Sequence, residues 1–300
     1  MRILIFGAGA LGSLIGALLS ERHEVHLVTR LGNAQAIKEK GVRIEGVLNG
    51  IFSLESHTDL EDIPQPDVIF VTVKAYDTKA ALDALATISR EARMVLSLQN
   101  GLTNLKQFRS ALPDKAVMGV TSMGATLVGP GLVRYAGKGE TVFGTLGDDR
   151  LLSIEAAVLF REAGLMARSD SNIERELWMK GIVNASINPL TAILRCRNGE
   201  LLEDEDVLAV ANQACSEGVA VAEGIGVSLP EGDPFTKVRE VMRDTAQNKS
   251  SMLQDLEKGK RTEIEEITGE IVRTAGSLDV SVPVNHTLLA LVKHLERQAL

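Results

Sequence analysis

One stretch of the sequence combines a cation and two amides at helical spacing. Lys180, Asn184 and Asn188 are separated by four residues each, which places all three on one face of a helix. The neighbouring residues are mostly apolar, so we expect this helix to be largely buried and its polar groups to need partners. A lysine ammonium in such a place can stabilise negative charge on an oxygen and donate a proton to it.

The alternative for this stretch is a polar strip that faces solvent. Trp178 and the isoleucines around it make that reading the less favoured one, because large apolar residues are usually buried. Pro189 follows Asn188 directly and is expected to end or kink the helix there.

A second stretch has the residue types of a phosphate-binding turn. Residues 2–6 form a short apolar run typical of a buried strand, and apolar residues recur at helical spacing over residues 11–19. Between them lies the run Gly7-Ala8-Gly9-Ala10-Leu11-Gly12. In a strand–turn–helix context the first glycine permits the turn, the second lets the backbone approach a pyrophosphate and the third allows close packing. We therefore predict dinucleotide binding, against the alternative of a glycine turn without ligand.

The expected second strand, residues 25–28, indicates which dinucleotide is preferred. An NAD-specific fold usually places an acid at the end of this strand, where it holds the ribose 2′-hydroxyl. This sequence has Thr29 and Arg30 there instead. Because a guanidinium suits a phosphate, we predict NADP(H) over NAD(H), with a plain surface arginine as the alternative.

The rest of the chain changes character near residue 168. Before it, apolar strand-like runs alternate with helical ones. The runs at residues 67–73 and 94–98 end at Lys74 and Asn100, at the edge where ligands bind in open α/β sheets. Beyond it the periodicity is helical. We predict an α/β fold: a Rossmann-like dinucleotide-binding domain over 1–168, followed by an all-α domain over 169–300.

Several local predictions accompany this division. An Asn-Gly turn at residues 49–50 predicts a hairpin between residues 42–45 and 51–54. A second antiparallel hairpin is expected between residues 133–135 and 141–144. Ser251 and Gln254 have the spacing of a capping box, so we expect a helix to open there. A further helix is expected to open at residues 262–265.

Composition excludes several classes of function. The net charge of −8 and a pI near 5.3 argue against nucleic-acid binding. Two cysteines, Cys196 and Cys215, cannot form a disulfide framework, which favours a cytoplasmic protein. The apolar residues 3–19 are shorter than a membrane span and lack a small-residue cleavage site. His23 and His26 are expected to be a strand-edge surface pair, with no metal site, since further ligands are missing.

At this point the sequence resembles the ketopantoate reductase (2-dehydropantoate 2-reductase) family over essentially its whole length. The resemblance lies in the glycine turn and in more specific runs further along the chain. These runs are Val73-Lys74-Ala75, Gln99-Asn100-Gly101, Trp178-Met179-Lys180 through Asn184 to Asn188-Pro189-Leu190-Thr191, Asn198-Gly199-Glu200, Asn248-Lys249-Ser250-Ser251-Met252-Leu253-Gln254-Asp255 and Arg261-Thr262-Glu263-Ile264-Glu265.

The resemblance implies NADPH-dependent reduction of 2-dehydropantoate to pantoate, on the way to coenzyme A, at a site between the two domains. It makes Lys180 the general acid, and it gives substrate contacts to Asn100, Asn184, Asn188, Asn198, Asn248 and Ser251. It gives cofactor contacts to Lys74, Asn100, Ala125 and Glu263, beside the glycine turn and Arg30.

Two other readings stay open. One is a reductase of the same fold that acts on another small 2-keto or 3-keto acid. The other is a nucleotide-sensing module without turnover, which would have no need of a proton donor such as Lys180. The sequence does not set the oligomeric state, and a homodimer is among the states it allows.

Overall fold

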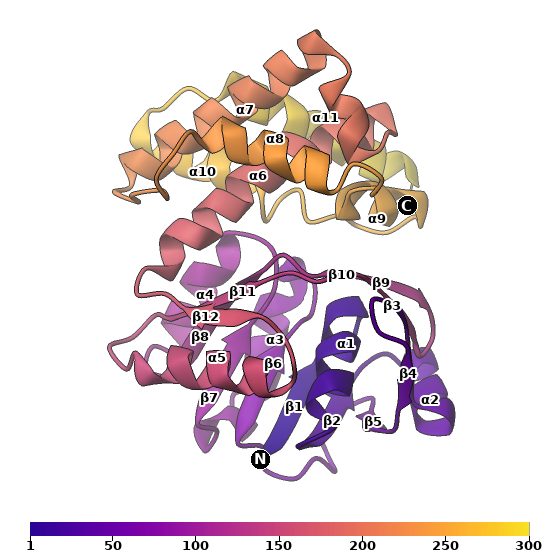
Figure 1. Cartoon of the computed structure of the whole chain (residues 1–300). Coiled ribbons are helices and arrows are strands. Elements are labelled where there is room, and N and C mark those ends of the chain that lie inside the picture. Colours follow the sequence, from indigo (N-terminus) through magenta and orange to yellow (C-terminus); the bar gives the residue numbers. More distant parts are fainter. Residues whose placement is uncertain (300) are drawn as a thin grey trace. The chain divides into compact units, whose positions relative to one another are not determined.

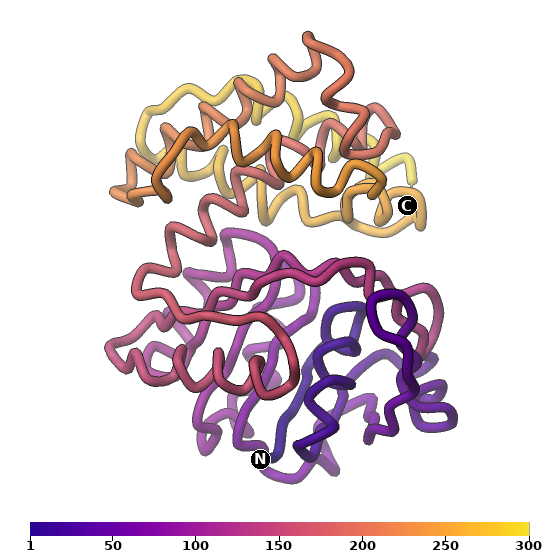
Figure 2. The backbone as a smooth tube through the Cα atoms, in the orientation of Figure 1, coloured from indigo at the N-terminus to yellow at the C-terminus, as the bar shows by residue number. Residues whose placement is uncertain are grey.

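A computed structural model of the protein describes residues 1–299. The chain forms two compact units. The first consists of Met1–Gln99 and Asn104–Ile173, and the second consists of Asn100–Thr103 and the chain from Glu174 onward. Figure 1 labels the helices and strands, and Figure 2 follows the chain through the first unit in indigo and magenta and through the second in orange and yellow.

The first unit is built on an eight-stranded sheet within residues 1–299, in the order β12-β11-β8-β7-β6-β1-β2-β5. All its pairings are parallel except that of β11 with β8. This is the Rossmann-like fold predicted from the sequence, with β1 between β6 and β2. The strands are β1 (Arg2–Phe6), β2 (Glu24–Val28), β5 (Glu55–His57), β6 (Val68–Val71), β7 (Met94–Ser97), β8 (Ala116–Thr121), β11 (Thr141–Thr145) and β12 (Ala167–Ser169).

Helices and a second sheet cover this framework. The helices are α1 (Ala10–Leu19), α2 (Leu31–Lys40), α3 (Thr78–Leu85), α4 (Thr103–Ala111) and α5 (Leu151–Glu162). Two short 3₁₀ turns span Ala75–Asp77 and Ile88–Arg90. The second sheet has the order β4-β3-β10-β9, with β3 (Val42–Gly46), β4 (Gly50–Phe52), β9 (Gly124–Gly129) and β10 (Leu132–Gly137). The core of the unit is continuous from the central strands through α1 to this sheet.

One predicted hairpin is confirmed and the other is wrong. Strand β3 pairs antiparallel with β4, with Arg43 opposite Ile51. Strand β10 does not pair with β11. It pairs antiparallel with β9 and parallel with β3, whereas β11 joins the large sheet beside β8. The buried faces decide this outcome: Val133 and Tyr135 pack toward α1, and Phe143 packs against Phe160 of α5.

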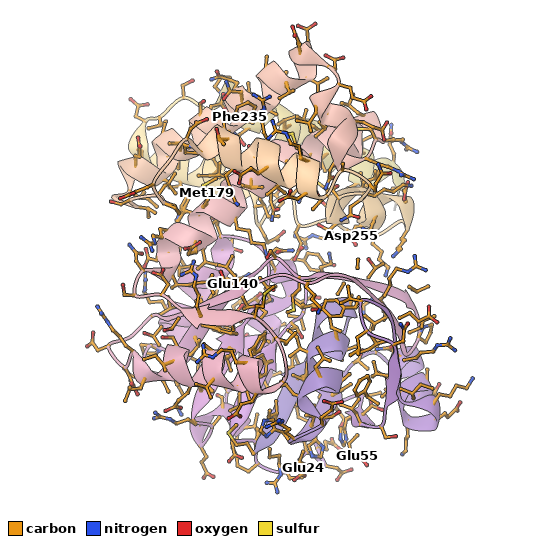
Figure 3. The ribbon with its side chains drawn as sticks, in the orientation of Figure 1. Glu24, Glu55, Glu140, Met179, Phe235 and Asp255 are labelled. Carbon is orange, nitrogen blue, oxygen red and sulfur yellow. The ribbon has the colours of Figure 1, made fainter. Side chains whose placement is uncertain are left out.

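The expected surface pair of histidines is also corrected. His26 is buried in β2, and its ring lies 3.1 Å from the His57 ring of β5 and 3.0 Å from Glu24. The residues labelled Glu24 and Glu55 in Figure 3 mark the starts of β2 and β5. Burial lowers the pKa of His57. No group of three or more His, Cys, Asp or Glu residues within the described chain is placed to hold a metal ion.

The second unit is helical. Its helices are α6 (Ile173–Leu194), α7 (Glu205–Gly224), α8 (Pro234–Asp244), α9 (Ser251–Glu257), α10 (Thr268–Leu278) and α11 (Pro283–Ala299), with a 3₁₀ turn at Asn198–Leu202. An apolar core holds α6, α7, α8, α10 and α11 together, and the same helices gather in Figure 1. None of the helices within residues 1–299 has the length and apolarity that a bilayer span needs.

Helix α6 continues through Pro189, so of the two outcomes expected there, an end or a kink, the end is wrong. A proline inside a helix removes one hydrogen bond and crowds the preceding turn. Residues on both sides of it are buried, including Ile187, Leu190 and Ala192. Burial of this apolar surface outweighs the local preference.

The two expected helix starts are corrected in detail. Ser250, not Ser251, is the N-cap of α9, and its hydroxyl accepts a hydrogen bond from the Leu253 N–H (3.1 Å). Helix α10 begins at Thr268 rather than within residues 262–265. Thr262 instead closes a local turn, in which its hydroxyl accepts from the Ile264 N–H (3.2 Å). Serine and threonine hydroxyls can cap such turns as readily as helices.

Candidate active site

The glycine turn in the first unit has three distinct backbone environments. Gly7 has φ +102°, and a side chain there would collide with Val73 of the neighbouring strand end. A side chain at Gly12 would collide with Thr72 and with the Gly7 carbonyl. At Gly9, by contrast, an added Cβ would meet only the Gly7 carbonyl, at 3.9 Å. Protein atoms therefore fill the space beside Gly7 and Gly12 and leave it open beside Gly9.

The N-terminus of α1 is also open. Gly9 is its N-cap and supplies no side-chain cap, and no acidic residue lies in the first turn. The first N–H groups of a helix have no partner within the helix, and they attract an anion together with the helix dipole. The residues present therefore fit a pyrophosphate at this turn, with Ala10, Leu11 and Gly12 presenting the N–H groups.

Polar side chains that sequence reasoning missed hold the turn. The Thr72 hydroxyl donates to the Gly7 carbonyl (2.9 Å). The Ala8 carbonyl accepts from Ser13 (3.1 Å), Thr29 (3.1 Å) and Asn33 (2.9 Å). Ser13 lies in α1 and Asn33 in α2, and Thr29 and Thr72 follow the ends of β2 and β6. Because these positions are spread along the chain, no local sequence motif indicates them.

Arg30 lies at the start of α2, where it is exposed and has an extended backbone. No acidic residue lies in the first turn of α2. Next to Arg30, a side chain added at Gly32 would meet nothing within 4 Å. A cation, uncapped N–H groups and open space thus coincide at the end of β2, an arrangement that suits a phosphate.

Lys74 and Asn100 follow the ends of β6 and β7, and a buried network anchors both ends. The Gln99 amide donates to the Val73 carbonyl (2.9 Å) and to the Thr78 hydroxyl (2.7 Å), and it accepts from Ser97 (3.0 Å). The Thr78 hydroxyl donates in turn to Asn104 (2.8 Å). Lys74 and Asn100 are half-buried, as is Ala125 on β9.

In the second unit, α6 brings three predicted residues onto one face. Because the helix runs without a break from Ile173 to Leu194, Lys180, Asn184 and Asn188 keep the spacing of successive turns. Lys180 and Asn184 are half-buried and Asn188 is buried. Met179, labelled in Figure 3, marks this part of α6.

Lys180 is the most perturbed cation of the site. Burial lowers the pKa of Lys180 to about 8, and the nearby Glu263 carboxylate opposes this shift. Glu263 is itself buried, in the turn before α10. An ammonium with a pKa near 8 is still mostly protonated at neutral pH and gives up its proton more readily than an ordinary lysine.

The remaining predicted residues gather around two joined segments. The Asn198 N–H donates to the Asn248 carbonyl (3.0 Å), and the Asn198 side chain donates to Thr245 (2.8 Å). The amide oxygen of Asn198 is buried without a hydrogen-bond partner. Such an oxygen needs a donor, which a hydroxyl-bearing ligand can supply. Asn248 and Ser251 are exposed; Asn248 lies just before α9 and Ser251 is its first residue. Asp255, labelled in Figure 3, marks this helix.

The fold and these features together define a class: Rossmann-like dinucleotide-binding proteins with a helical second unit that carries a perturbed lysine. Residues 3–148 match the family described as ketopantoate reductase PanE/ApbA, and residues 172–296 match its C-terminal part. The chain belongs to the ketopantoate reductase family.

Individual relatives cover the whole chain. The 2-dehydropantoate 2-reductase of Archaeoglobus fulgidus is 42% identical over 299 residues, covering 98% of each chain. A crystal structure of a PanE/ApbA family ketopantoate reductase from Ralstonia eutropha has a TM-score of 0.92 at 34% identity, covering 100% of this chain and 99% of that one. A D-mandelate dehydrogenase, solved with NADH and anilino(oxo)acetate, has a TM-score of 0.94 at 28% identity with the same coverage.

Proposed function

We propose that this protein reduces 2-dehydropantoate to (R)-pantoate with NADPH, a step of pantothenate and coenzyme A biosynthesis. The support is the family, the relatives that carry this name, and the site described above. In this proposal residues 1–168 hold the dinucleotide and residues 169–300 supply the acid. The observation that carries it is Lys180, with its lowered pKa, on one helix face with two amides and near Glu263.

The chemistry divides between the cofactor and the chain. A bound nicotinamide dinucleotide supplies the hydride for the keto carbon. Lys180 stabilises the negative charge that develops on the keto oxygen and donates the Nζ proton to it, which completes the alcohol. Solvent then restores the proton to Lys180. Glu263 keeps the ammonium charged before the reaction, since its carboxylate raises the pKa of Lys180.

The amides orient the substrate. Asn184 and Asn188 lie on the helix face of Lys180 and can hold oxygens of a keto acid in register with it. The unpartnered amide oxygen of Asn198 suits the terminal hydroxyl of 2-dehydropantoate. A simple keto acid without that hydroxyl would leave this oxygen unpaired, which costs binding free energy.

Most of the proposed cofactor contacts lie in the first unit, and Asn100 and Glu263 belong to the second. The glycine turn from Gly7 to Gly12 binds the pyrophosphate, and Arg30 binds the 2′-phosphate. Lys74, Asn100 and Ala125 would line the rest of the dinucleotide, and Glu263 would complete its contacts. We prefer NADPH because a cation, and no acid, stands at the end of β2.

A second candidate is the reduction of another 2-keto acid, which the similarity to the D-mandelate dehydrogenase favours. The experiment that separates the two is the rate of NADPH oxidation with 2-dehydropantoate and with the 2-keto acid that corresponds to mandelate, repeated with NADH. We expect the highest kcat/KM for 2-dehydropantoate with NADPH. A higher kcat/KM for the aromatic keto acid would overturn the proposed substrate, and equal or better use of NADH would overturn the cofactor preference.

A further inference from the structure

The peptide carbonyl of Ala8, within the glycine turn, is held by an unusual number of donors. Ser13, Thr29 and Asn33 all donate to it, at 3.1, 3.1 and 2.9 Å. A carbonyl oxygen has two lone pairs, so these donors occupy it fully. The carbonyl is thereby fixed toward the protein, and the orientation of the following N–H groups of the turn is fixed with it.

Asn33 differs from the other two donors because it reaches further segments. Its amide nitrogen also lies 3.2 Å from the Thr29 hydroxyl. Its amide oxygen accepts from the Gly131 N–H (2.8 Å), in the turn between β9 and β10. One side chain therefore connects the glycine turn, the end of β2 and a turn of the second sheet.

Asn33 also lies on the helix turn that presents Arg30. Its own N–H donates to the Arg30 carbonyl (3.0 Å). The Asn33 side chain thus adds a connection between the start of α2, with its cation, and the glycine turn. It does so beside the Thr29 hydroxyl, and beside the Gly7 and Ala8 N–H groups, which donate to the Val28 carbonyl. Among these connections it is the one that comes from within α2 itself, since the pairing of β1 with β2 reaches only as far as Val28, opposite Phe6.

We propose that Asn33 is a positioning residue for the cofactor. It holds the pyrophosphate-binding turn and the Arg30-bearing start of α2 at a fixed spacing, and it thereby sets the preference for a dinucleotide that carries a 2′-phosphate. This inference rests on the proposed function, since it requires dinucleotide binding at the glycine turn. Asn33 acts through the backbone of Ala8 and through Arg30.

The test compares three single variants. Asn33→Leu keeps the approximate volume of the side chain and removes its hydrogen bonds. Thr29→Val removes one donor to the same carbonyl and serves where Asn33→Leu does not fold. Ser56→Ala is the matched control, because the Ser56 hydroxyl donates to the Ala34 carbonyl of the same helix (2.8 Å) and does not contact the glycine turn.

The measurement is the Kd of NADPH and of NADH by fluorescence titration, together with Tm. Asn33→Leu loses three side-chain hydrogen bonds, two of them to the glycine turn and to Thr29, and we expect its NADPH Kd to rise about tenfold. We expect a smaller rise in the NADH Kd of this variant. For Thr29→Val we expect the NADPH Kd to rise about threefold, and again the NADH Kd to rise less. Ser56→Ala should lower Tm and leave both Kd values unchanged. In an Arg30→Ala background, the effect of Asn33→Leu on NADPH should fall to its effect on NADH.

A purely structural role for Asn33 would lower Tm without changing the ratio of the two Kd values. An NADPH Kd within twofold of wild type, or equal losses for both dinucleotides, overturns the inference while the proposed function stands. Unchanged Kd values of Thr29→Val for both dinucleotides would likewise overturn the inference and leave the proposed function standing. If the wild-type protein binds neither dinucleotide, the proposed function itself fails.

Discussion

The hydroxyl of Thr191 lies 2.7 Å from the hydroxyl of Ser250, and both side chains are buried. Thr191 also lies 3.0 Å from the Asn188 carbonyl, and Ser250 caps α9. This pair joins the α6 segment that carries Asn184 and Asn188 to the start of the helix that carries Ser251. It therefore fixes the distance between the two groups of proposed substrate contacts.

Ser250→Ala should weaken both stability and substrate binding. Loss of a serine N-cap typically costs about 1 kcal/mol, and the released start of α9 should raise KM for the keto acid several-fold with little change in the NADPH Kd. Urea unfolding and steady-state kinetics check this. Ser216→Ala is the control, since that exposed hydroxyl only donates to the Asn212 carbonyl of its own helix. A variant with wild-type KM would show that the pair is only structural.

Substitution of Arg30 should separate the two cofactors. Arg30→Ala removes the cation at the start of α2, so we expect the NADPH Kd to rise by tenfold or more, on the order of 1.5–3 kcal/mol for a charge-assisted contact. The NADH Kd should change far less. Parallel titrations with both dinucleotides measure this, with Arg22→Ala as an exposed control. Equal changes in the NADPH and NADH Kd values would show that Arg30 does not bind the 2′-phosphate.

The two alanine substitutions Gly9→Ala and Gly12→Ala should have different effects. At Gly12 the methyl group collides with Thr72 and with backbone, so we expect a loss of about 1–3 kcal/mol of stability. At Gly9 the methyl group enters open space, so Tm should change little and the dinucleotide Kd should rise. Gly32→Ala, which also meets open space in a helix, is the control for stability. Normal NADPH binding by Gly9→Ala would contradict the position of the pyrophosphate.

The activity of the enzyme should fall on the alkaline side. In the proposed mechanism the protonated form of Lys180 is the acid, and burial lowers the pKa of Lys180 to about 8. Most of the enzyme carries this proton below pH 8, and the fraction declines as the pH rises above that value. We expect kcat/KM for reduction to fall about tenfold per pH unit above 8. A profile that stays flat to pH 10 would show that Lys180 titrates normally or takes no part in proton transfer.

The sequence was sufficient for the fold class and for the helix face of Lys180, because both follow from short-range periodicity and from motifs such as the glycine turn. The pairing of strands and the capping residues of helices were less predictable. β10 joins β9 and β3 rather than β11 because burial, not proximity in sequence, selects the partner. Pro189 is tolerated in α6 for a similar reason, since buried neighbours on both sides hold the helix.

The supporting residues of the candidate site could not be read from the sequence at all. Asn33, Thr72 and Thr191 act through side chains that meet residues far away in the chain. Their types are ordinary for loops and helix turns, so no pattern distinguishes them. Only the three-dimensional placement shows that they hold the glycine turn and the start of α9.

The central claim is that Lys180 supplies the proton in an NADPH-dependent reduction of 2-dehydropantoate. The most direct measurement is the rate of NADPH oxidation with this substrate for the wild type and for Lys180→Ala, with the NADPH Kd determined for both. General acid assistance is typically worth about 10²–10⁴-fold, so we predict a loss of turnover on that scale with NADPH binding retained. Turnover by Lys180→Ala close to that of the wild type would contradict the account.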